Sequence, residues 1–254
     1  MPTPIRSIVA KYLHEPEEIS VIRGDQSRAS VDHQYLMVRS RDRFEALKRC
    51  IAQEPEIYGI VFCRTKDQTR EVANQLSQEG LAADAIHGDL SQMQREYVMD
   101  RFRKKIIRLL VATDVAARGI DVDDLSHVIH YELPNDGESY VHRSGRTGRA
   151  GKAGTSLAFA GPQDSYKIRS LERRLPNGMR RMQIPQAKEI METRIERFVD
   201  DLIKADPRES LFTSALSKGA EKLLELSREE LVAKLLHREF ASQISHAESQ
   251  VEIR

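Results

Sequence analysis

Residues 110–122 read LVATDVAARGIDV, an aliphatic run that breaks abruptly into a polar loop. Its first residues have the character of a strand buried on both faces. The loop that follows offers a hydroxyl at Thr113 and carboxylates at Asp114 and Asp121. Buried strands that end in polar side chains are typical of the ligand-binding edge of a parallel sheet. We therefore expect the chemistry of this protein to lie directly after its buried strands.

The same alternation of apolar runs and polar loops extends over residues 31–174. Between several apolar runs, apolar residues recur three or four positions apart, which predicts helices. Strand–helix alternation of this kind favours an α/β fold, a parallel sheet with helices on both faces. The runs predict strands at Tyr35–Val38, Gly59–Cys63, Leu81–Ile86, Arg108–Ala112, His127–Leu133 and Thr155–Ala160.

The pattern changes beyond Leu175, where LPNGM (175–179) supplies the Pro and Gly typical of a boundary. From Ile190 onward the apolar residues follow helical spacing, and Ser227 with Glu230 has the spacing of a capping box. We therefore expect no strand after Leu175 and an all-α C-terminal extension. The predicted segments are 1–30, an α/β domain over 31–185, and a helical extension over 186–254.

The composition is that of a soluble globular protein, with 254 residues, 40% apolar and 31% charged. No apolar run approaches the roughly 20 residues that a membrane-spanning helix needs. Cys50 and Cys63 lie within apolar segments. They are interpreted as small buried hydrophobes rather than as a disulfide or a metal site, which favours a reducing, cytoplasmic compartment.

The stretch HRSGRTGR (142–149) gathers three arginines and a histidine in a chain whose net charge is only +1. A helix capped at Ser139 would place His142, Arg146 and Arg149 on one face, where like charges repel unless an anion is present. A solvated basic face is the alternative. The two interspersed glycines are poor helix formers, and the stretch follows an apolar strand by about one turn. The pattern favours an anion site.

Two further strand ends carry polar side chains of a similar kind. In AIHGDLSQMQREYV (85–98), Ser91 and Gln94 form a capping box that predicts a helix, with Gln92 and Arg95 facing outward on one side. In VFCRTKDQT (61–69), a strand ends in Arg, Thr and Lys. Each loop alone is explained by turns and caps. Together with 110–122 and 142–149, they describe a surface for a phosphate-bearing chain.

In this order and spacing, the loops resemble the second RecA-like domain of superfamily 2 helicases, specifically the DEAD-box RNA helicases. The resemblance covers about residues 1–174. VFCRTK is similar to motif IV of that family, HGDLSQMQR to the motif written IVa or QxxR, ATDVAARGIDV to motif V, and YVHRSGRTGR to motif VI.

The opening MPTPIRSIVAKYL resembles the segment after motif III, so residues 1–30 are expected to be the linker from a first RecA-like domain. The sequence contains no G-x-x-x-x-G-K-[ST] and no D-E-A-D. We expect the domain that holds ATP and Mg²⁺ to lie outside this chain, and the chain alone to be inactive as an ATPase.

The resemblance implies a role for each loop. Arg146 and Arg149 would be arginine fingers on the γ-phosphate, with His142 completing the catalytic set. His142 and Arg143 would connect across the cleft and to motif V. Asp121, Gly119 and Arg143 would bind the nucleotide, with Asp121 at the ribose. RNA would be bound mostly through sugar and phosphate by Arg64, Thr65, Gly88, Asp89, Gln92, Arg95 and Thr113. The implied cofactor is ATP, and the implied partners are RNA and the first RecA-like domain.

The sequence thus indicates the second helicase domain of an ATP-dependent RNA helicase that unwinds duplexes locally. The alternatives are a non-enzymatic RNA-binding or dimerisation module and a DNA helicase domain. The tail resembles the helical dimerisation region of bacterial cold-shock DEAD-box helicases, which implies a homodimer. The alternative for the tail is that its apolar stripes pack on each other and on the α/β domain.

Overall fold

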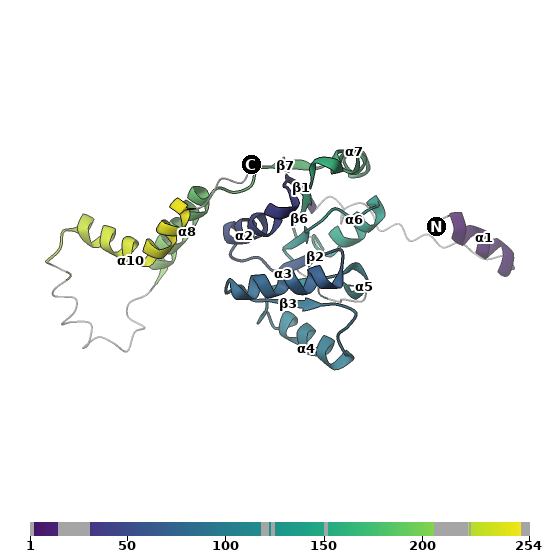
Figure 1. Ribbon diagram of the computed structural model, residues 1–254, viewed down its shortest axis with the longest axis horizontal. Coiled ribbons are helices and arrows are strands. Elements are labelled where there is room, and N and C mark those ends of the chain that lie inside the picture. Colours follow the sequence, from purple (N-terminus) through teal and green to yellow (C-terminus); the bar gives the residue numbers. More distant parts are fainter. Residues whose placement is uncertain are drawn as a thin grey trace.

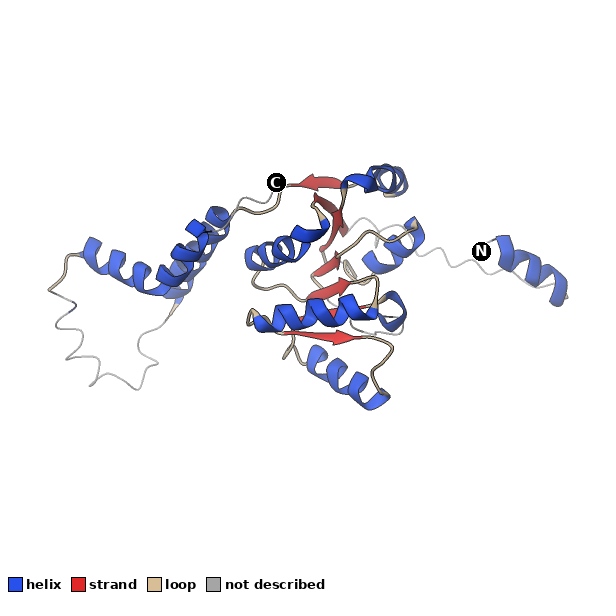
Figure 2. Ribbon diagram, viewed as in Figure 1, coloured by secondary structure: helices blue, strands red, loops and turns tan. Residues whose placement is uncertain are grey.

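Seven parallel strands form one sheet in the order β3-β4-β2-β5-β6-β1-β7, with helices on both sides (Figure 2). In this computed structural model, the described residues are 3–14, 31–117, 122, 125–149, 152–205, 223 and 225–249. The α/β expectation is confirmed. The strands are β1 (Val31–Met37), β2 (Gly59–Phe62), β3 (Ala83–Ile86), β4 (Leu109–Ala112), β5 (His127–His130), β6 (Gly154–Ala160) and β7 (Arg180–Met182).

Helices follow most of the strands, and two long helices form the tail (Figure 1). They are α1 (Thr3–Tyr12), α2 (Arg43–Gln53), α3 (Lys66–Gln78), α4 (Gln92–Arg103), α5 (Asp114–Ala117), α6 (Gly137–Ser144), α7 (Ser165–Arg174), α8 (Ala187–Lys204) and α10 (Arg228–Ser249). Two short 3-10 helices, η2 (Ser40–Asp42) and η3 (Pro162–Asp164), precede α2 and α7. The capping box at Ser91 and Gln94 is confirmed at the start of α4, and Ser227 Oγ accepts from Glu230 N at the start of α10.

Alternate residues of each central strand face opposite cores. On β2, Val61 packs with α2 and α3, whereas Ile60 and Phe62 pack with α4 and α5. On β6, Ala158 and Ala160 face α6 and α7. Strands β2 and β4 are buried along their whole length, as strands covered by helices on both faces must be. This two-sided burial fixes which loops emerge at the carboxyl edge of the sheet.

The expectation of no strand after Leu175 is wrong. Strand β7, with the sequence Arg-Arg-Met, pairs in parallel with β1 at the edge of the sheet. Its side chains are largely exposed, so it carries no apolar run that a sequence pattern could reveal. The edge is charged, which is how natural sheets discourage further strand pairing.

The tail packs against the α/β domain through α8, which contacts α2, and α10 lies beside α8 (Figure 1). Arg197 donates to the carbonyl of Gln53 at 3.4 Å, and Phe198 meets Phe240 edge-on with ring centroids 5.5 Å apart. Within the described ranges, no helix has both the length and the apolar character needed to cross a membrane.

Candidate functional site

The polar strand ends predicted to carry the chemistry lie together at the carboxyl edge of the sheet. Neighbouring strands stop in register, with Ile86 of β3 and Phe62 of β2 both opposite Ala112 of β4. Phe62 also lies opposite His130 of β5. The loops that follow β3, β4, β2 and β5 therefore leave the sheet side by side, which is the usual position of a ligand site in such a fold.

After β2, Thr65 and Arg64 occupy the start of α3. The Thr65 hydroxyl caps the helix by accepting from Gln68 N at 3.2 Å. The Arg64 guanidinium is exposed but held from the loop after β5, donating to Asn135 Oδ1 at 2.7 Å with Glu132 4.0 Å away. Glu132 also accepts from Gln68 at 2.9 Å. These contacts hold the Arg64 guanidinium in a fixed orientation at the carboxyl edge of the sheet.

After β3, Gly88 and Asp89 lie exposed at the same edge. Asp89 is paired with Lys66 at 3.0 Å and with Arg70 at 3.3 Å. The hydrogen bond from Lys66 lowers the pKa of the Asp89 carboxyl. Arg70 also lies 3.8 Å from Asp67, so two cations and two carboxylates balance in this cluster, and Asp89 can accept a hydrogen bond from a hydroxyl without making this edge negative.

On α4, the predicted pair Gln92 and Arg95 have different surroundings. Gln92 is exposed and donates to Glu96 at 2.7 Å. Arg95 is half-buried and donates to the carbonyl of Ala116 at 2.7 Å, which joins α4 to α5. The two side chains therefore share one helix but only Arg95 connects two of the candidate loops.

After β4, Thr113 and Asp114 begin α5. The Thr113 hydroxyl accepts from Ala116 N at 3.3 Å. Asp114 binds Arg143 of α6 through two hydrogen bonds, from Nε at 2.5 Å and from Nη2 at 2.7 Å. A bidentate guanidinium–carboxylate pair of this kind fixes the relative orientation of the two side chains as well as their distance.

Arg143 is buried beneath the site. Besides Asp114, it contacts the carbonyl of Glu132 at 3.3 Å and lies over the ring of Phe62, 5.1 Å from its centroid. The resemblance implied that Arg143 binds the nucleotide and connects to the loop after β4, and its pair with Asp114 makes that connection. Through these contacts the guanidinium joins the ends of β2, β4 and β5, so we assign it the role of a positioning residue.

The helix expected to carry all of HRSGRTGR is shorter than predicted. Asp136, not Ser139, caps α6 by accepting from Ser139 N at 2.8 Å, and the helix ends at Ser144. The backbone hydrogen bond from Ser139 lowers the pKa of Asp136, which stays ionised at the helix start. The prediction that His142, Arg146 and Arg149 share one helical face is therefore wrong. His142 is exposed in the last turn, whereas both arginines follow in what we call the arginine loop, residues 145–149.

Hydrogen bonds and close packing against neighbouring segments hold the backbone of the arginine loop in place. Thr147 donates to the carbonyls of Leu125 and Ser126, and forms a bridge with Leu125. Gly148 has φ of +68°, a conformation that favours glycine. A Cβ at Gly154 of β6 would collide with Thr147 Oγ1 and Gly148 N, so glycine there permits the close approach. Arg149 Nε donates back to the carbonyl of Gly145 at 2.8 Å. Arg146 and Arg149 are both half-buried at this edge.

A buried polar network lies under α6. Tyr140 OH is 3.1 Å from His33 Nδ1 and accepts from Ser156 Oγ at 3.2 Å. Ser156 Oγ is also 2.8 Å from Ser144 Oγ and 3.1 Å from His130 Nε2. The His130 ring stacks on Tyr140 with centroids 4.4 Å apart. The network ties α6 to β1, β5 and β6.

Sequence reasoning missed several of the residues that organise this edge. Asp114, Glu132, Asp136 and Tyr140 hold the others but were not predicted to do so. The signal for Asp114 and Glu132 was present, since both closely follow a buried strand. The two predicted nucleotide contacts Gly119 and Asp121 lie outside the described residues. Among the residues that are described, no three or more His, Cys, Asp or Glu side chains are grouped as a metal site requires.

Two family models match the chain. The "Helicase conserved C-terminal domain" matches residues 42–151, and the "Probable ATP-dependent RNA helicase, helical domain" matches residues 190–248. The first contains every loop described above, and the second covers most of the tail.

The chain is also similar to individual DEAD-box proteins. The DEAD-box ATP-dependent RNA helicase CshA of Geobacillus kaustophilus is 40% identical over 226 residues, which is 89% of this chain and 48% of that protein. The chain spans about half the length of this curated relative. The E. coli DEAD-box protein SrmB, in its structure bound to the regulator of ribonuclease activity A, is 32% identical with a TM-score of 0.56, covering 60% of this chain and 90% of that one. S. cerevisiae Dbp5 bound to RNA and ADP BeF3 is 26% identical with a TM-score of 0.64, covering 78% and 53%.

Proposed function

Because the chain belongs to the DEAD-box RNA helicase family and carries its C-terminal, RecA-like domain, we propose that it supplies part of the ATP site and half of the RNA surface of an ATP-dependent RNA helicase. The observation that carries the proposal is the Asp114–Arg143 pair. It joins the loop after β4 to α6, so the proposed RNA and ATP loops are held as one unit. ATP-driven closure against a first RecA-like domain would then act on both.

The arginine loop is proposed to face the γ-phosphate of ATP. Arg146 and Arg149 are always charged, and their planar guanidinium groups suit the charge that develops on a phosphoryl group during transfer. The fixed backbone around Thr147 and Gly148 supports this role, because a preorganised cation stabilises a transition state without rearranging. His142 would contact the same region from the last turn of α6.

Asp121, Gly119 and Arg143 would bind the nucleotide, with Asp121 at the ribose, and Arg143 would also act through Asp114 on the loop after β4. Mg²⁺, which ATP hydrolysis in this family implies, has no group of candidate ligands among the residues that the structure describes. We assign the metal to the first RecA-like domain.

RNA would lie along the other loops of the carboxyl edge. Arg64, Lys66 and Arg70 offer exposed cationic groups for phosphates. Exposed Gly88, Gln92, Thr65 and half-buried Thr113 offer backbone or side-chain polar groups for sugar and phosphate oxygens. Arg95 would contact RNA from its position between α4 and α5. Contacts to the sugar–phosphate chain predict weak sequence preference, and 2′-hydroxyl contacts predict a preference for RNA over DNA.

We propose residues 1–30 as the linker, 31–185 as the second RecA-like domain and 186–254 as a helical extension that forms a homodimer. Part of the tail packs internally, as the alternative requires, since Ile190 and Phe240 are buried. The homodimer is supported by the apolar side chains that this packing leaves exposed, which a second copy of the tail would cover. These are Leu202, Ile203, Leu223, Val232 and Leu235. A protein that acts on RNA with ATP and has two unpaired cysteines is expected in the cytoplasm.

The proposed function is tested with the full-length protein by measuring ATP turnover with no nucleic acid, with single-stranded RNA and with DNA of the same sequence. RNA is expected to stimulate turnover more than DNA does. The 254-residue chain alone is expected to show no turnover. RNA-stimulated hydrolysis by this chain alone, or equal stimulation by DNA, would contradict the proposal.

The RNA surface is tested with Arg64→Gln. Loss of one phosphate contact should weaken binding about equally for all RNA sequences and reduce the slope of log K against log[salt] by about 0.7. Arg103→Gln is the matched control, because Arg103 is exposed at the far end of α4, near the opposite edge of the sheet. A loss of affinity confined to one RNA sequence would indicate base recognition instead.

A further inference from the structure

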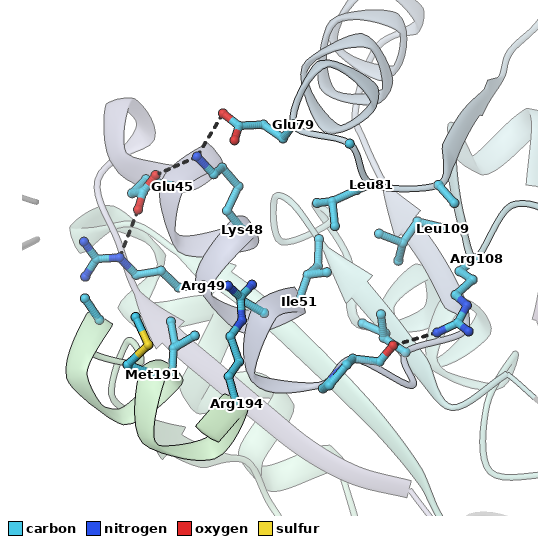
Figure 3. Close-up of a pocket in the computed structure, with 17 residues that line it drawn as sticks. Glu45, Lys48, Arg49, Ile51, Glu79, Leu81, Arg108, Leu109, Met191 and Arg194 are labelled. Atoms are coloured by element: carbon cyan, nitrogen blue, oxygen red, sulfur yellow. Dashed lines mark hydrogen bonds and ion pairs between the residues drawn. The ribbon is translucent and has the colours of Figure 1, made fainter. Parts of the chain in front are cut away.

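The amino and carboxyl edges of the sheet hold their cations in different ways. At the amino edge, a cavity of about 480 Å³ lies between α2 and the first turns of α8 (Figure 3). Lys48 at its rim contacts Glu79 at 2.9 Å and Glu45 at 3.5 Å. Arg49 contacts the same Glu45 at 3.0 Å. Both cations are matched by carboxylates, and such pairs hold the fold together but leave little charge for an anionic ligand.

At the carboxyl edge, Arg64 is oriented by a neutral side chain. Its Nη2 donates to Asn135 Oδ1 at 2.7 Å, and Asn135 is exposed in the loop between β5 and α6. The carboxylate that it reaches is Glu132, whose oxygen is 4.0 Å from Arg64 Nη1. Glu132 lies closer to the buried Arg43, at 2.8 Å. The closest contact of the Arg64 guanidinium is therefore an amide, which fixes its direction without neutralising its charge.

The backbone of Arg64 is held from the same loop, through Gln68. Gln68 Oε1 accepts from Arg64 N at 2.9 Å, and Gln68 Nε2 donates to Glu132 Oε1 at 2.9 Å. Glu132 is fixed in turn by its ion pair with Arg43 of α2. Both the backbone and the guanidinium of Arg64 are therefore held by residues 132–135, which directly follow β5.

We propose that Asn135 is a positioning residue for RNA binding, which directs the Arg64 guanidinium toward an RNA phosphate and leaves its charge available. The inference rests on the proposed function, in which Arg64 contacts RNA. Asn135 occupies one of the five N–H donors of a guanidinium that is 60% exposed, so donors remain for a phosphate. A long side chain loses rotamer freedom when it is ordered at an interface, and an arginine that is oriented before binding loses less. A carboxylate in place of the amide would compete with the phosphate for the same guanidinium.

Two substitutions of Asn135 separate the effect of orientation from that of charge. Asn135→Ala removes the acceptor and keeps the local charge, whereas Asn135→Asp keeps an acceptor and adds a carboxylate. Both are made in the full-length enzyme, alone and together with Arg64→Gln. The affinity for single-stranded RNA is measured by fluorescence titration at several salt concentrations, which gives both the binding constant and the slope of log K against log[salt].

Asn135→Ala should weaken RNA binding about threefold to tenfold, the effect of one long side chain that must be ordered on binding. The salt slope should stay that of the wild type, because the phosphate contact still forms. Asn135→Asp should reduce the slope by about 0.7, as Arg64→Gln does, because Arg64 then pairs with the new carboxylate. In the Arg64→Gln background, Asn135→Ala should have no further effect, since Asn135 acts through Arg64.

The same two substitutions at Asn177 are the matched control, because Asn177 is exposed in the turn between α7 and β7. Neither should change RNA affinity by more than about twofold. Thermal unfolding of each variant shows that it is folded. Gln68→Met is a second variant that leaves Asn135 in place. It removes the hydrogen bonds to Arg64 N and to Glu132, and should also weaken RNA binding at an unchanged salt slope.

The pattern of results distinguishes the positioning role from the proposed function. Wild-type affinity in Asn135→Ala, together with weaker binding by Arg64→Gln, would overturn the positioning role and leave the RNA surface intact. Wild-type affinity in Arg64→Gln would overturn both. A loss in Asn135→Ala that persists undiminished in the Arg64→Gln background would show that Asn135 acts by another route, which also overturns the positioning role. Equal salt slopes in Asn135→Asp and Asn135→Ala would overturn the part of the proposal that concerns charge.

Discussion

The arginine loop and the tail differ in how far the rest of the protein already holds their characteristic side chains. In the loop, the backbone around Thr147 and Gly148 is fixed by hydrogen bonds to Leu125 and Ser126 and by the close approach of Gly154. In the tail, α8 and α10 contact each other, yet Ile203 is 76% exposed and Val232 55%. The backbone of the arginine loop is already fixed, whereas the tail leaves apolar surface uncovered.

This difference indicates two kinds of partner. A loop that fixes its backbone while presenting cations is prepared for an anion and does not need it in order to fold. An apolar face gains free energy only when another apolar surface covers it. Changes in the loop should therefore affect turnover, and changes in the tail should affect assembly.

The largest effect is expected from Arg146→Ala in the full-length enzyme. If Arg146 stabilises charge on the transferring phosphoryl group, kcat should fall on the order of 10³-fold or more, the loss seen when an arginine finger is removed. Arg149→Ala should behave similarly. The free energy of unfolding should change by less than about 1 kcal/mol, since neither side chain is part of the core. RNA-stimulated ATP turnover near the wild-type rate in Arg146→Ala would rule out this role.

The second prediction concerns the tail. Val232→Glu places a charge in the exposed apolar face of α10, and should weaken a homodimer by on the order of 100-fold because a charge would be buried at the interface. His237→Glu is the control, because it adds a charge at an exposed polar position of the same helix. Light scattering at tens of micromolar should give a dimer mass for the wild-type chain and for the control, and a monomer mass for Val232→Glu. A monomeric wild-type chain contradicts the dimer.

A smaller effect, and one that separates positioning from catalysis, is expected from Arg143→Ala. Loss of its hydrogen bonds to Asp114 and to the carbonyl of Glu132 should cost about 2 kcal/mol of stability, which Arg146→Ala should not. Turnover should fall as well, because α5 and α6 are no longer tied together. The stabilities are compared by urea unfolding of the 254-residue chain. Arg143→Lys keeps the charge but cannot form the bidentate pair, so it should recover only part of the stability that Arg143→Ala loses. Equal stability of Arg143→Ala and wild type would remove the positioning role.

The sequence could predict those parts of the fold that local pattern determines. The apolar runs near 59–63, 108–112 and 155–160 are strands, because each is buried between helices on both faces. The start of α4 followed from its capping box. Placement of the strand-end loops at one edge followed from the parallel sheet alone.

The rest depends on partners that are distant in the chain. Strand β7 forms because β1 offers an open edge, and the residues Arg-Arg-Met do not by themselves predict a strand. The helix α6 ends at Ser144, directly before Gly145, and Thr147 then donates to the carbonyl of Leu125, a distant contact that sequence spacing could not predict. Arg143 pairs with a residue 29 positions away, and sequence spacing could not tell a buried positioning arginine from one that faces a ligand.

The smallest expected effect is a loss of stability in mild acid, which tests the buried network under α6. Burial lowers the pKa of His130 well below 6.5, and the nearby charges of Arg143 and His33 lower it further. Burial also lowers the pKa of His33 and of His127, although a nearby carboxylate opposes each shift. Between these folded-state pKa values and 6.5, the unfolded chain binds more protons than the folded one. The histidines therefore contribute their full stability above pH 6.5 and progressively lose it as the pH falls below that value.

The urea midpoint of the 254-residue chain should accordingly be lower at pH 5.5 than at pH 7.5. Carboxyl groups with lowered pKa, such as that of Asp136, protonate only below 3.8 and do not contribute in this interval. His130→Asn should reduce the difference between the two midpoints, because one of the protons taken up on unfolding is then missing. Equal midpoints at the two pH values would show that the network under α6 tolerates protonation of these histidines and would contradict the prediction.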